Sequence, residues 1–127
     1  MIMIFDLKFL KFFTNYIFIN LISNARKYCE AENPTLIVRV IRQGTMTAVD
    51  FIDNGRGISP ENYELIFEKF SRISDESKAG GAGLGLAICR EIMRRLGGDV
   101  SYLPQVKGTG FRVVLPQAAL APALENI

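Results

Sequence analysis

The order of helical and β-rich segments is the feature that most constrains how this sequence can fold. Two long stretches have helical periodicity, at residues 7–30 and 83–97. Each is followed by a pair of β-rich runs, at 36–41 and 46–52 after the first and at 99–103 and 111–115 after the second. Because no helix separates the strands of a pair, the regular βαβ alternation of a parallel α/β fold is absent. We expect an α+β protein, a two-layer sandwich with helices on one face of a mixed sheet.

Turn and capping residues mark the ends of these segments. Gln43-Gly44-Thr45 predicts a hairpin between the first two strands. A short helix is predicted over Glu61–Phe70, with Ser59 as its N-cap and Pro60 at its first position. Gly97-Gly98 predicts the end of the second long helix.

Length and composition bound the kind of protein. The 127 residues suffice for one domain, which we expect to span residues 1–116, with a loose tail at 117–127 where proline and alanine recur. Fifteen basic and thirteen acidic residues give a net charge of +2, which is too balanced for a protein that mainly grips nucleic acid. The two cysteines exclude a disulfide framework and a zinc site, and we expect both to be reduced, small apolar residues.

The N-terminal segment has one property of a secretory signal peptide, since Lys8 and Lys11 precede an apolar run at 12–22. The run is about half as long as a membrane span requires, and Thr14 and Asn15 interrupt it. We therefore expect a helix that stays in the protein, no membrane span in this chain, and a cytoplasmic location. Cleavage as a signal peptide is the alternative.

The first long helix has an apolar stripe and a polar side that differ in chemistry. The apolar residues, which we expect to face the sheet, are Phe18, Leu21, Ile22, Ala25 and Cys29. The residues on the opposite side are Asn20, Asn24, Lys27 and Tyr28. Amide oxygens suit Mg²⁺, a lysine one turn on suits phosphate, and a tyrosine can stack on a flat ring. A solvated polar face would account for the same residues.

Two glycine-bearing segments can each bring a ligand close to the backbone. In Asp53-Asn-Gly-Arg-Gly-Ile58 a carboxylate follows a hydrophobic strand, although a plain turn would use the same residues. In Gly80–Leu86 the glycines at 81, 83 and 85 free backbone amides at the N-terminus of a helix, which favours anions. The second segment lacks the Gly-Lys-Ser/Thr ending of a P-loop and the βαβ context of a dinucleotide fold. It therefore indicates a different kind of phosphate site.

The order of these motifs resembles the catalytic ATP-binding domain of bacterial sensor histidine kinases. Asn20–Tyr28 is similar to the asparagine box, Asp53–Ile58 and Gly81–Leu86 to the two glycine boxes, and Ile66–Phe70 to the phenylalanine box. Lys107–Pro116 is similar to the last strand of that family, so the resemblance covers about residues 15–116. It implies the Bergerat fold, in which a strand normally precedes the first helix; Met1–Phe13 lacks its pattern, and we expect that strand to be missing.

The resemblance implies ATP and Mg²⁺ as cofactors and a role for each matching residue. Asn24 and Asn20 would hold Mg²⁺, and Asn20, Lys27 and Arg72 would serve catalysis, the last two at the phosphates. Asp53 would accept a hydrogen bond from the adenine amino group. Residues 59–82 would form an ATP lid. The other nucleotide-binding residues that the motifs imply are Tyr28, Gly55, Gly57, Ile58, Phe67, Phe70, Gly81, Gly83, Leu84, Gly85, Leu86 and Thr109.

The chain departs from the family pattern in its lack of histidine, which excludes any His base or His phosphoacceptor within it. The resemblance then implies transfer of the γ-phosphoryl group to a His-bearing dimerisation domain outside this chain, with a response regulator as the further partner. Asn20 stands where ATP-hydrolysing members of the superfamily usually carry Glu, and an amide cannot accept a proton, so we expect slow hydrolysis. The alternatives are a non-catalytic nucleotide-binding interaction module and an anti-sigma-type serine kinase of the same fold.

Overall fold

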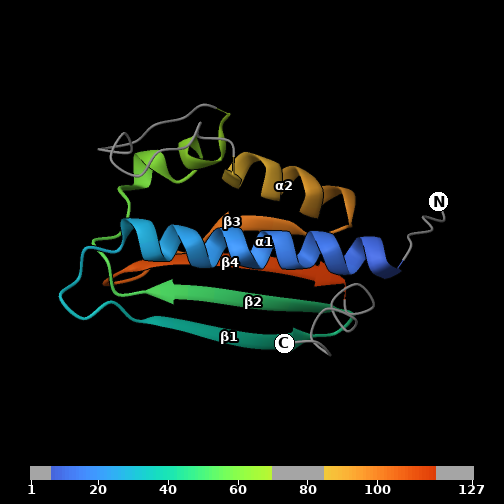
Figure 1. Ribbon diagram of the computed structural model, residues 1–127, viewed down its shortest axis with the longest axis horizontal. Helices are drawn as coiled ribbons and strands as arrows, with labels where there is room; N and C mark the ends of the chain where they lie inside the picture. Colours follow the sequence, from blue (N-terminus) through green and yellow to red (C-terminus); the bar gives the residue numbers. More distant parts are fainter. Residues whose placement is uncertain (1–6, 70–84, 117–127) are drawn as a thin grey trace.

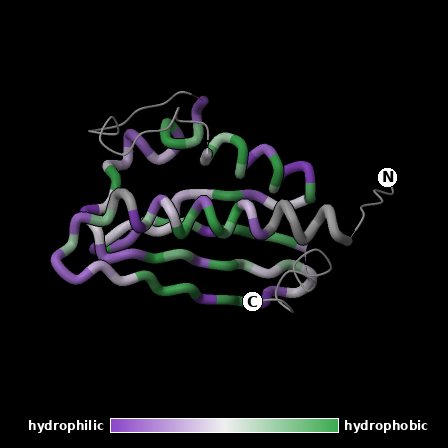
Figure 2. Tube along the Cα trace, in the orientation of Figure 1, coloured by the Kyte–Doolittle hydropathy of each residue, from purple (hydrophilic) through white to green (hydrophobic). Residues whose placement is uncertain are grey.

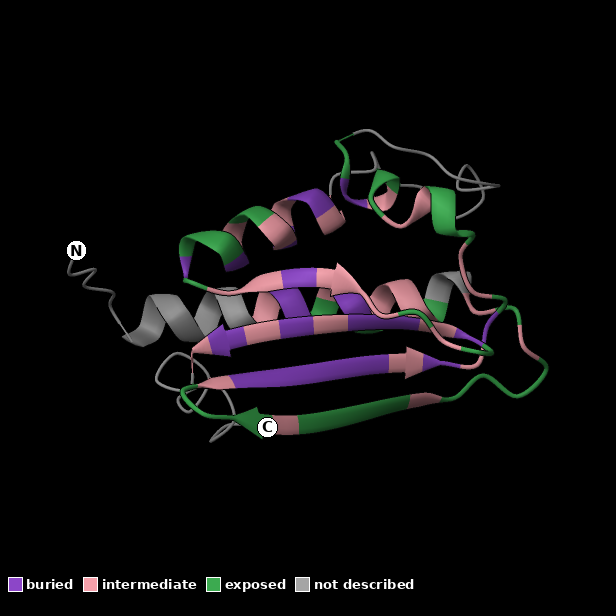
Figure 3. Ribbon diagram, turned by 180° about the vertical axis from the view of Figure 1, so that it is seen from behind, coloured by how far each residue is buried: buried purple, intermediate pink, exposed green. Residues whose placement is uncertain are grey.

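The computed structural model describes residues 7–69 and 85–116, with side chains described at 15–26, 29–69 and 85–116. The elements, in chain order, are α1 (Leu7–Tyr28), β1 (Leu36–Gln43), β2 (Met46–Asp53), the 3₁₀ turns η1 (Pro60–Asn62) and η2 (Leu65–Phe67), α2 (Gly85–Arg95), β3 (Asp99–Tyr102) and β4 (Thr109–Pro116). Figures 1 and 3 view the molecule from opposite sides and place α1 in front of the sheet in one and behind it in the other. The α+β class, with α1 on one face of the sheet, is confirmed.

The sheet has the strand order β1-β2-β4-β3, and every pairing among these strands is antiparallel. The mixed character that we expected is therefore not found among the described strands. Short connections account for two of these pairings. The predicted turn at Gly44 joins β1 to β2, and a short loop joins β3 to β4. Such connections produce antiparallel neighbours. In the described residues α1 comes before every strand, and residues 1–6 lie outside them.

The core lies between the sheet and the two helices. Its fully buried side chains come from every layer: Ile17 and Leu21 on α1, Cys89 and Met93 on α2, and Val49, Val100, Val113 and Leu115 on the strands. Both cysteines are free, as expected, and burial raises the pKa of the Cys89 thiol to about 12. Cys89 thus behaves as a small apolar residue, whereas Cys29 is only half-buried.

The apolar stripe predicted on the first helix is partly wrong. Phe18 and Leu21 are buried, but Ile22 is 46% exposed and Ile17 takes its place in the core. Since α1 packs against α2 as well as against β2, its buried arc is centred on positions 17 and 21. Position 22 lies about 100° around the helix from position 21 and falls outside that arc.

The short helix predicted over 61–70 is also wrong. The chain forms two 3₁₀ turns there, and Ser59 makes no side-chain cap; only its carbonyl accepts from the Asn62 amide, at 2.8 Å. Tyr63 and Phe67 both pack on aromatic rings of the sheet, and these tertiary contacts prevail over local helix propensity. Phe70 lies outside the described residues.

The predicted end of the second long helix is confirmed. Gly97 has φ +88°, and the Gly98 amide donates to the Met93 carbonyl at 2.8 Å, which is the hydrogen bond of a Schellman cap. Residues 83 and 84, where we placed the start of this helix, lie outside the described residues, as does the tail at 117–127. Neither described helix has the length and apolar character to cross a membrane.

Candidate functional site

Asp53, the last residue of β2, is a buried carboxylate with 9% of its surface exposed. Burial raises its pKa above the ordinary value of 3.8, while hydrogen bonds act against that rise. The Gly55 amide donates to Oδ1 at 2.8 Å, and the neighbouring Thr109 also acts to lower the pKa of the carboxyl. Thr109 is opposite Asp53 in the β2–β4 register, so the sheet itself brings these two predicted site residues together.

The loop that follows Asp53 needs its glycines for packing. A Cβ at Gly55 would lie 2.8 Å from Asp53 Oδ1, and one at Gly57 would lie 2.8 Å from the Gly108 carbonyl oxygen. Gly57 also has φ +82°, a conformation that favours glycine. Close contact with the Asp53 carboxylate accounts for Gly55, and close contact with the β3–β4 loop accounts for Gly57, whether or not a ligand also approaches this segment.

Ile58, at the end of this loop, is held by a residue that the sequence analysis did not single out. The Ile58 amide donates to the hydroxyl of Tyr102 at 3.2 Å. Tyr102 is the last residue of β3 and stacks on Tyr63, with ring centroids 4.4 Å apart. The only signal for this role in the sequence is that Tyr102 lies two residues after buried Val100, so that both side chains are on the same face of β3.

Asn54 is a second residue for which the sequence motifs predicted no role. Its side-chain oxygen accepts from the Thr35 amide at 2.9 Å and from the Cys29 thiol at 3.3 Å, and its Nδ2 donates to the Asn33 carbonyl at 2.9 Å. Asn54 thus ties the loop between α1 and β1 to the segment that carries Asp53.

The two motifs that were predicted to hold Mg²⁺ and phosphate meet at the start of α2. The Asn20 Nδ2 donates to the Tyr16 carbonyl at 2.9 Å, and Asn20 Oδ1 lies 3.0 Å from where a Cβ would stand on Gly85, the first residue of α2. An amide oxygen beside a helix N-terminus fits an Mg²⁺–phosphate group, because the metal takes oxygen ligands and the helix end favours anions. Asn24 is half-buried one turn further along α1. No three His, Cys, Asp or Glu side chains gather into a metal cluster in the part of the chain that the structure describes.

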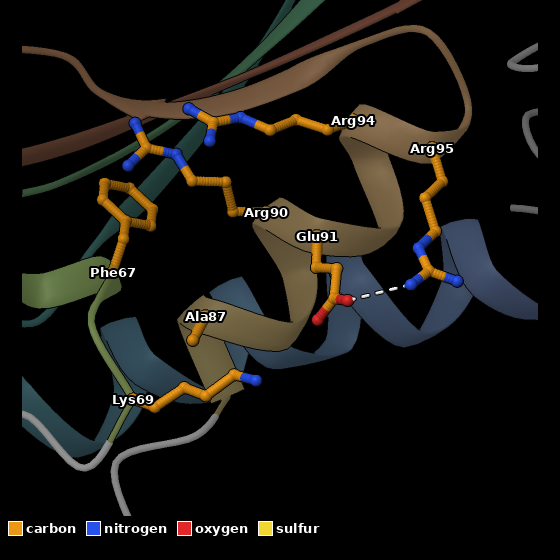
Figure 4. A pocket seen from close by; sticks show the side chains of 7 residues that line it. All are labelled: Phe67, Lys69, Ala87, Arg90, Glu91, Arg94 and Arg95. Atoms are coloured by element: carbon orange, nitrogen blue, oxygen red, sulfur yellow. Dashed lines mark hydrogen bonds and ion pairs between the residues drawn. The ribbon is translucent and has the colours of Figure 1, made fainter.

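Phe67 is buried at η2, where Arg90 of α2 holds it. The Arg90 guanidinium lies 4.0 Å above the Phe67 ring, as Figure 4 shows, and its Nη1 forms an ion pair with Glu64 at 2.7 Å. Phe67 meets Phe111 edge-on at 6.3 Å. A shallow pocket of about 450 Å³ beside this contact is lined by Phe67, Lys69, Ala87, Arg90, Glu91, Arg94 and Arg95, and only Phe67 among them is a predicted site residue.

A second open hollow, of about 720 Å³, lies at the end of the molecule that carries the first glycine motif. Its lining residues are Glu30, Ala31, Glu32, Asn33, Asn54, Gly55, Arg56, Val106 and Lys107. Charges of both signs line it, with Arg56 and Glu30 paired at 3.3 Å, and Gly55 is the one predicted site residue among them.

Several predicted site residues lie outside the described residues. They are Phe70, Arg72, Gly81, Gly83 and Leu84, together with the side chains of Lys27 and Tyr28, whose backbone belongs to α1. Leu86 is described, half-buried and packed against the core. The described part of the site therefore has two poles, Asp53 with Thr109 and Ile58, and Asn20 with Gly85.

This chain is similar to known proteins in sequence and in fold. The family model described as "Histidine kinase-, DNA gyrase B-, and HSP90-like ATPase" matches residues 13–119. The sensor protein KdpD of Escherichia coli is 42% identical over 111 residues, which cover 87% of this chain but only 12% of KdpD. The chain thus spans a small part of the length of the curated relatives it matches.

Two solved structures have a similar fold. A mycobacterial sensor histidine kinase, MprB, matches with a TM-score of 0.72 and 28% identity over 82% of this chain and 72% of that chain. Full-length ShkA in complex with AMPPNP matches with a TM-score of 0.67 and 30% identity over 82% of this chain and 21% of that chain.

Proposed function

Because the chain belongs to the family of histidine kinase-, DNA gyrase B- and HSP90-like ATPases, we propose that it is the ATP–Mg²⁺-binding catalytic domain of a two-component sensor histidine kinase. Its curated relatives include sensor proteins and a histidine-protein kinase, and the ShkA structure holds an ATP analogue. The observation that carries the proposal is the convergence of motifs far apart in the sequence: Asp53 lies opposite Thr109 in the sheet, and Asn20 lies against Gly85.

At the adenine pole, Asp53 is the residue that selects the base. Its carboxylate accepts from the Gly55 amide and lies beside Thr109, and it accepts a further hydrogen bond from the adenine amino group. Guanine carries a carbonyl oxygen at that position, so the same carboxylate repels it. Gly57 and Ile58 form the wall beside the base, and Tyr28 packs on the nucleotide.

At the phosphate pole, Asn20 and Asn24 offer amide oxygens to Mg²⁺, which when bound supplies neutralisation of phosphate charge. The backbone amides of Gly81, Gly83 and Gly85 face the phosphates at the start of α2, with Leu84 and Leu86 between and after them. Lys27 and Arg72 balance the remaining negative charge, and Phe67 and Phe70 seat the lid at 59–82.

The reaction is phosphoryl transfer to a histidine on a separate dimerisation domain. The bond from the γ-phosphorus to the bridging oxygen breaks as a bond to an imidazole nitrogen of the acceptor forms, and ADP leaves. Asn20 positions groups but cannot take a proton from water, so hydrolysis competes poorly with transfer. Since these 127 residues contain no histidine, the acceptor comes from outside them, and a response regulator receives the phosphoryl group next.

A trans-phosphorylation assay tests this function. The protein is mixed with a His-bearing dimerisation domain of a related sensor kinase and with ATP labelled on its γ-phosphate. We expect acid-labile label on the dimerisation domain, lost in Asn24→Ala and kept in Asn15→Ala, which is the same change elsewhere on α1. Nucleotide binding without transfer to any acceptor would contradict a kinase and indicate a non-catalytic interaction module. Acid-stable label on serine would indicate a serine kinase of the same fold.

A further inference from the structure

Tyr102 joins the end of β3 to the loop that follows Asp53, across 44 positions of sequence. Its hydroxyl oxygen accepts from the Ile58 amide at 3.2 Å and lies 3.8 Å from where a Cβ would stand on Gly57. These are the two loop residues that form the wall beside the base in the proposed site. The tyrosine hydroxyl therefore holds the backbone on which that wall depends.

The ring of Tyr102 is itself fixed from two sides. Tyr63 stacks on it at 4.4 Å with an interplanar angle of 26°, and Phe111 meets it edge-on at 5.8 Å and 89°. Both arrangements are favourable for aromatic pairs. Because the ring is clamped in this way, its hydroxyl occupies a defined point, and burial raises its pKa above 10.0, which keeps it neutral near pH 7.

The loop from Asp53 to Ile58 is thus fastened to the β3–β4 hairpin at both ends. Asp53 pairs with Thr109 in the β2–β4 register at one end, and the Ile58 amide donates to Tyr102 at the other. Between them, Gly57 passes against the Gly108 carbonyl with no room for a side chain. Removing the Tyr102 hydroxyl would free one end of the loop and leave the other in place.

We propose that Tyr102 is a positioning residue for the adenine end of the site: its hydroxyl holds the Ile58 amide and so sets the place of the base-lining turn relative to Asp53. The proposal rests on the proposed function, since it assumes that adenine binds at this turn. Tyr102 acts on the base through Ile58 and Gly57 and has no proposed role at the phosphates. Its loss should therefore affect adenosine and ATP to the same extent.

The test compares Tyr102→Phe with Tyr16→Phe, the same change on α1. Each variant loses one hydroxyl from a partly buried ring that packs against the core, and of the two hydroxyls only that of Tyr102 bonds to the loop among the described contacts. For Tyr102→Phe we expect the Kd values of adenosine and of ATP to rise by the same factor, about fivefold, the size of one net hydrogen bond. In the transfer assay KM for ATP should rise while kcat stays unchanged. The Ile58 amide should exchange its hydrogen faster in the nucleotide-free variant.

Unchanged Kd values in Tyr102→Phe, with wild-type binding intact, would overturn the positioning role and leave the proposed function standing. A loss for ATP alone would also overturn it, because it would place Tyr102 at the phosphates. Equal losses in Tyr102→Phe and Tyr16→Phe would assign the effect to the loss of any core tyrosine hydroxyl and overturn the role of the Tyr102 hydroxyl. If the wild-type protein binds neither adenosine nor ATP, the proposed function fails and this proposal fails with it.

Discussion

At Asp53, burial and hydrogen bonding act on one carboxylate in opposite directions. Burial raises its pKa, and the donors at Gly55 and Thr109 act against that rise. A carboxylate that is held in a fixed orientation and largely removed from water discriminates strongly between a donor and an acceptor placed against it. This is the property that adenine selection requires.

Replacing Asp53 by asparagine tests that role directly. Asp53→Asn swaps one acceptor oxygen for an amino group and removes the charge, so it should weaken adenine nucleotides by roughly 1–3 kcal/mol, the cost of a lost partner at a buried polar group. Titration calorimetry with ATP measures the change. Asp99→Asn, the same substitution in a half-exposed salt bridge on β3, is the control and should leave ATP affinity unchanged. Equal affinity in Asp53→Asn and the wild type would remove Asp53 from the site.

The sequence was sufficient to predict the roles of residues that depend only on local structure. Asp53 at a strand end, and glycines at 55 and 57, could be predicted because turns and strand ends have local signatures. The roles of Tyr102 and Asn54 could not, because each depends on a partner more than twenty positions away whose placement follows from strand register and loop packing. Ile22 was misassigned because α1 packs on α2 as well as on the sheet.

At the scale of elements, Asp50 binds three strands together. This carboxylate of β2 is fully buried, and it accepts from Arg112 of β4 at 2.7 Å and from Arg39 of β1 at 2.9 Å. Both arginines are its register partners. The Arg112 guanidinium, with Arg39 beside it, holds the pKa of Asp50 below its ordinary value of 3.8.

A lowered pKa gives a defined dependence of stability on pH. The stabilisation from Asp50 is present above the ordinary pKa of 3.8 and is lost as the pH falls through the lower, folded-state pKa. Asp50→Asn should therefore lower the free energy of unfolding at pH 7 by about 1–3 kcal/mol, less than a fully buried pair would lose, because both arginines keep contact with water. Urea unfolding at pH 7 and at pH 3 measures it.

The variant should also lose less stability on acidification than the wild type does. Asp99→Asn is again the matched control, since it removes an exposed ion pair of small expected energy. If the free energy of unfolding falls by the same amount between pH 7 and pH 3 in Asp50→Asn and in the wild type, the Asp50 carboxylate contributes no pH-dependent stabilisation.

The sequence predicted helices and strands correctly where a hydrophobic pattern extended over many residues. Both long helices, the hairpin at Gly44 and all four strands lie where they were expected, within a few residues. The segment at 60–67 did not follow its local propensity, because two aromatic contacts with the sheet decide its conformation. The antiparallel pairing of β1 with β2 and of β3 with β4 follows from their short connections, which the sequence does contain, whereas that of β2 with β4 joins strands far apart in the sequence.

At the scale of the whole molecule, one edge of the described sheet, strand β1, is largely exposed. Figure 3 shows β1 largely exposed beside a buried β2, and Figure 2 shows that hydrophobic residues follow its length. Val38 and Val40 pair with Phe51 and Val49 on the helix-covered face, yet they are 51% and 47% exposed. An apolar edge strand with free backbone groups invites pairing with another chain.

We therefore expect this chain to self-associate through β1 as its concentration rises. Val38→Lys places a charge in the middle of this edge and should shift the population towards monomer. Ile19→Lys, which changes an exposed apolar residue on α1 and leaves the sheet edge intact, should not. Sedimentation velocity over a range of concentrations measures the distribution, and a wild-type protein that stays monomeric throughout would contradict this expectation.

We propose that the two poles of the described site, at Asp53 and at Asn20 with Gly85, bind one molecule of ATP with Mg²⁺. Titration calorimetry of the wild-type protein with ATP, with and without Mg²⁺, measures this binding. We expect saturable binding with a Kd at or below about 1 mM, strengthened by Mg²⁺. That strengthening should be lost in Asn24→Ala and kept in Asn15→Ala. Absence of ATP binding at millimolar concentrations in the presence of Mg²⁺ would show that the two poles do not form an ATP site.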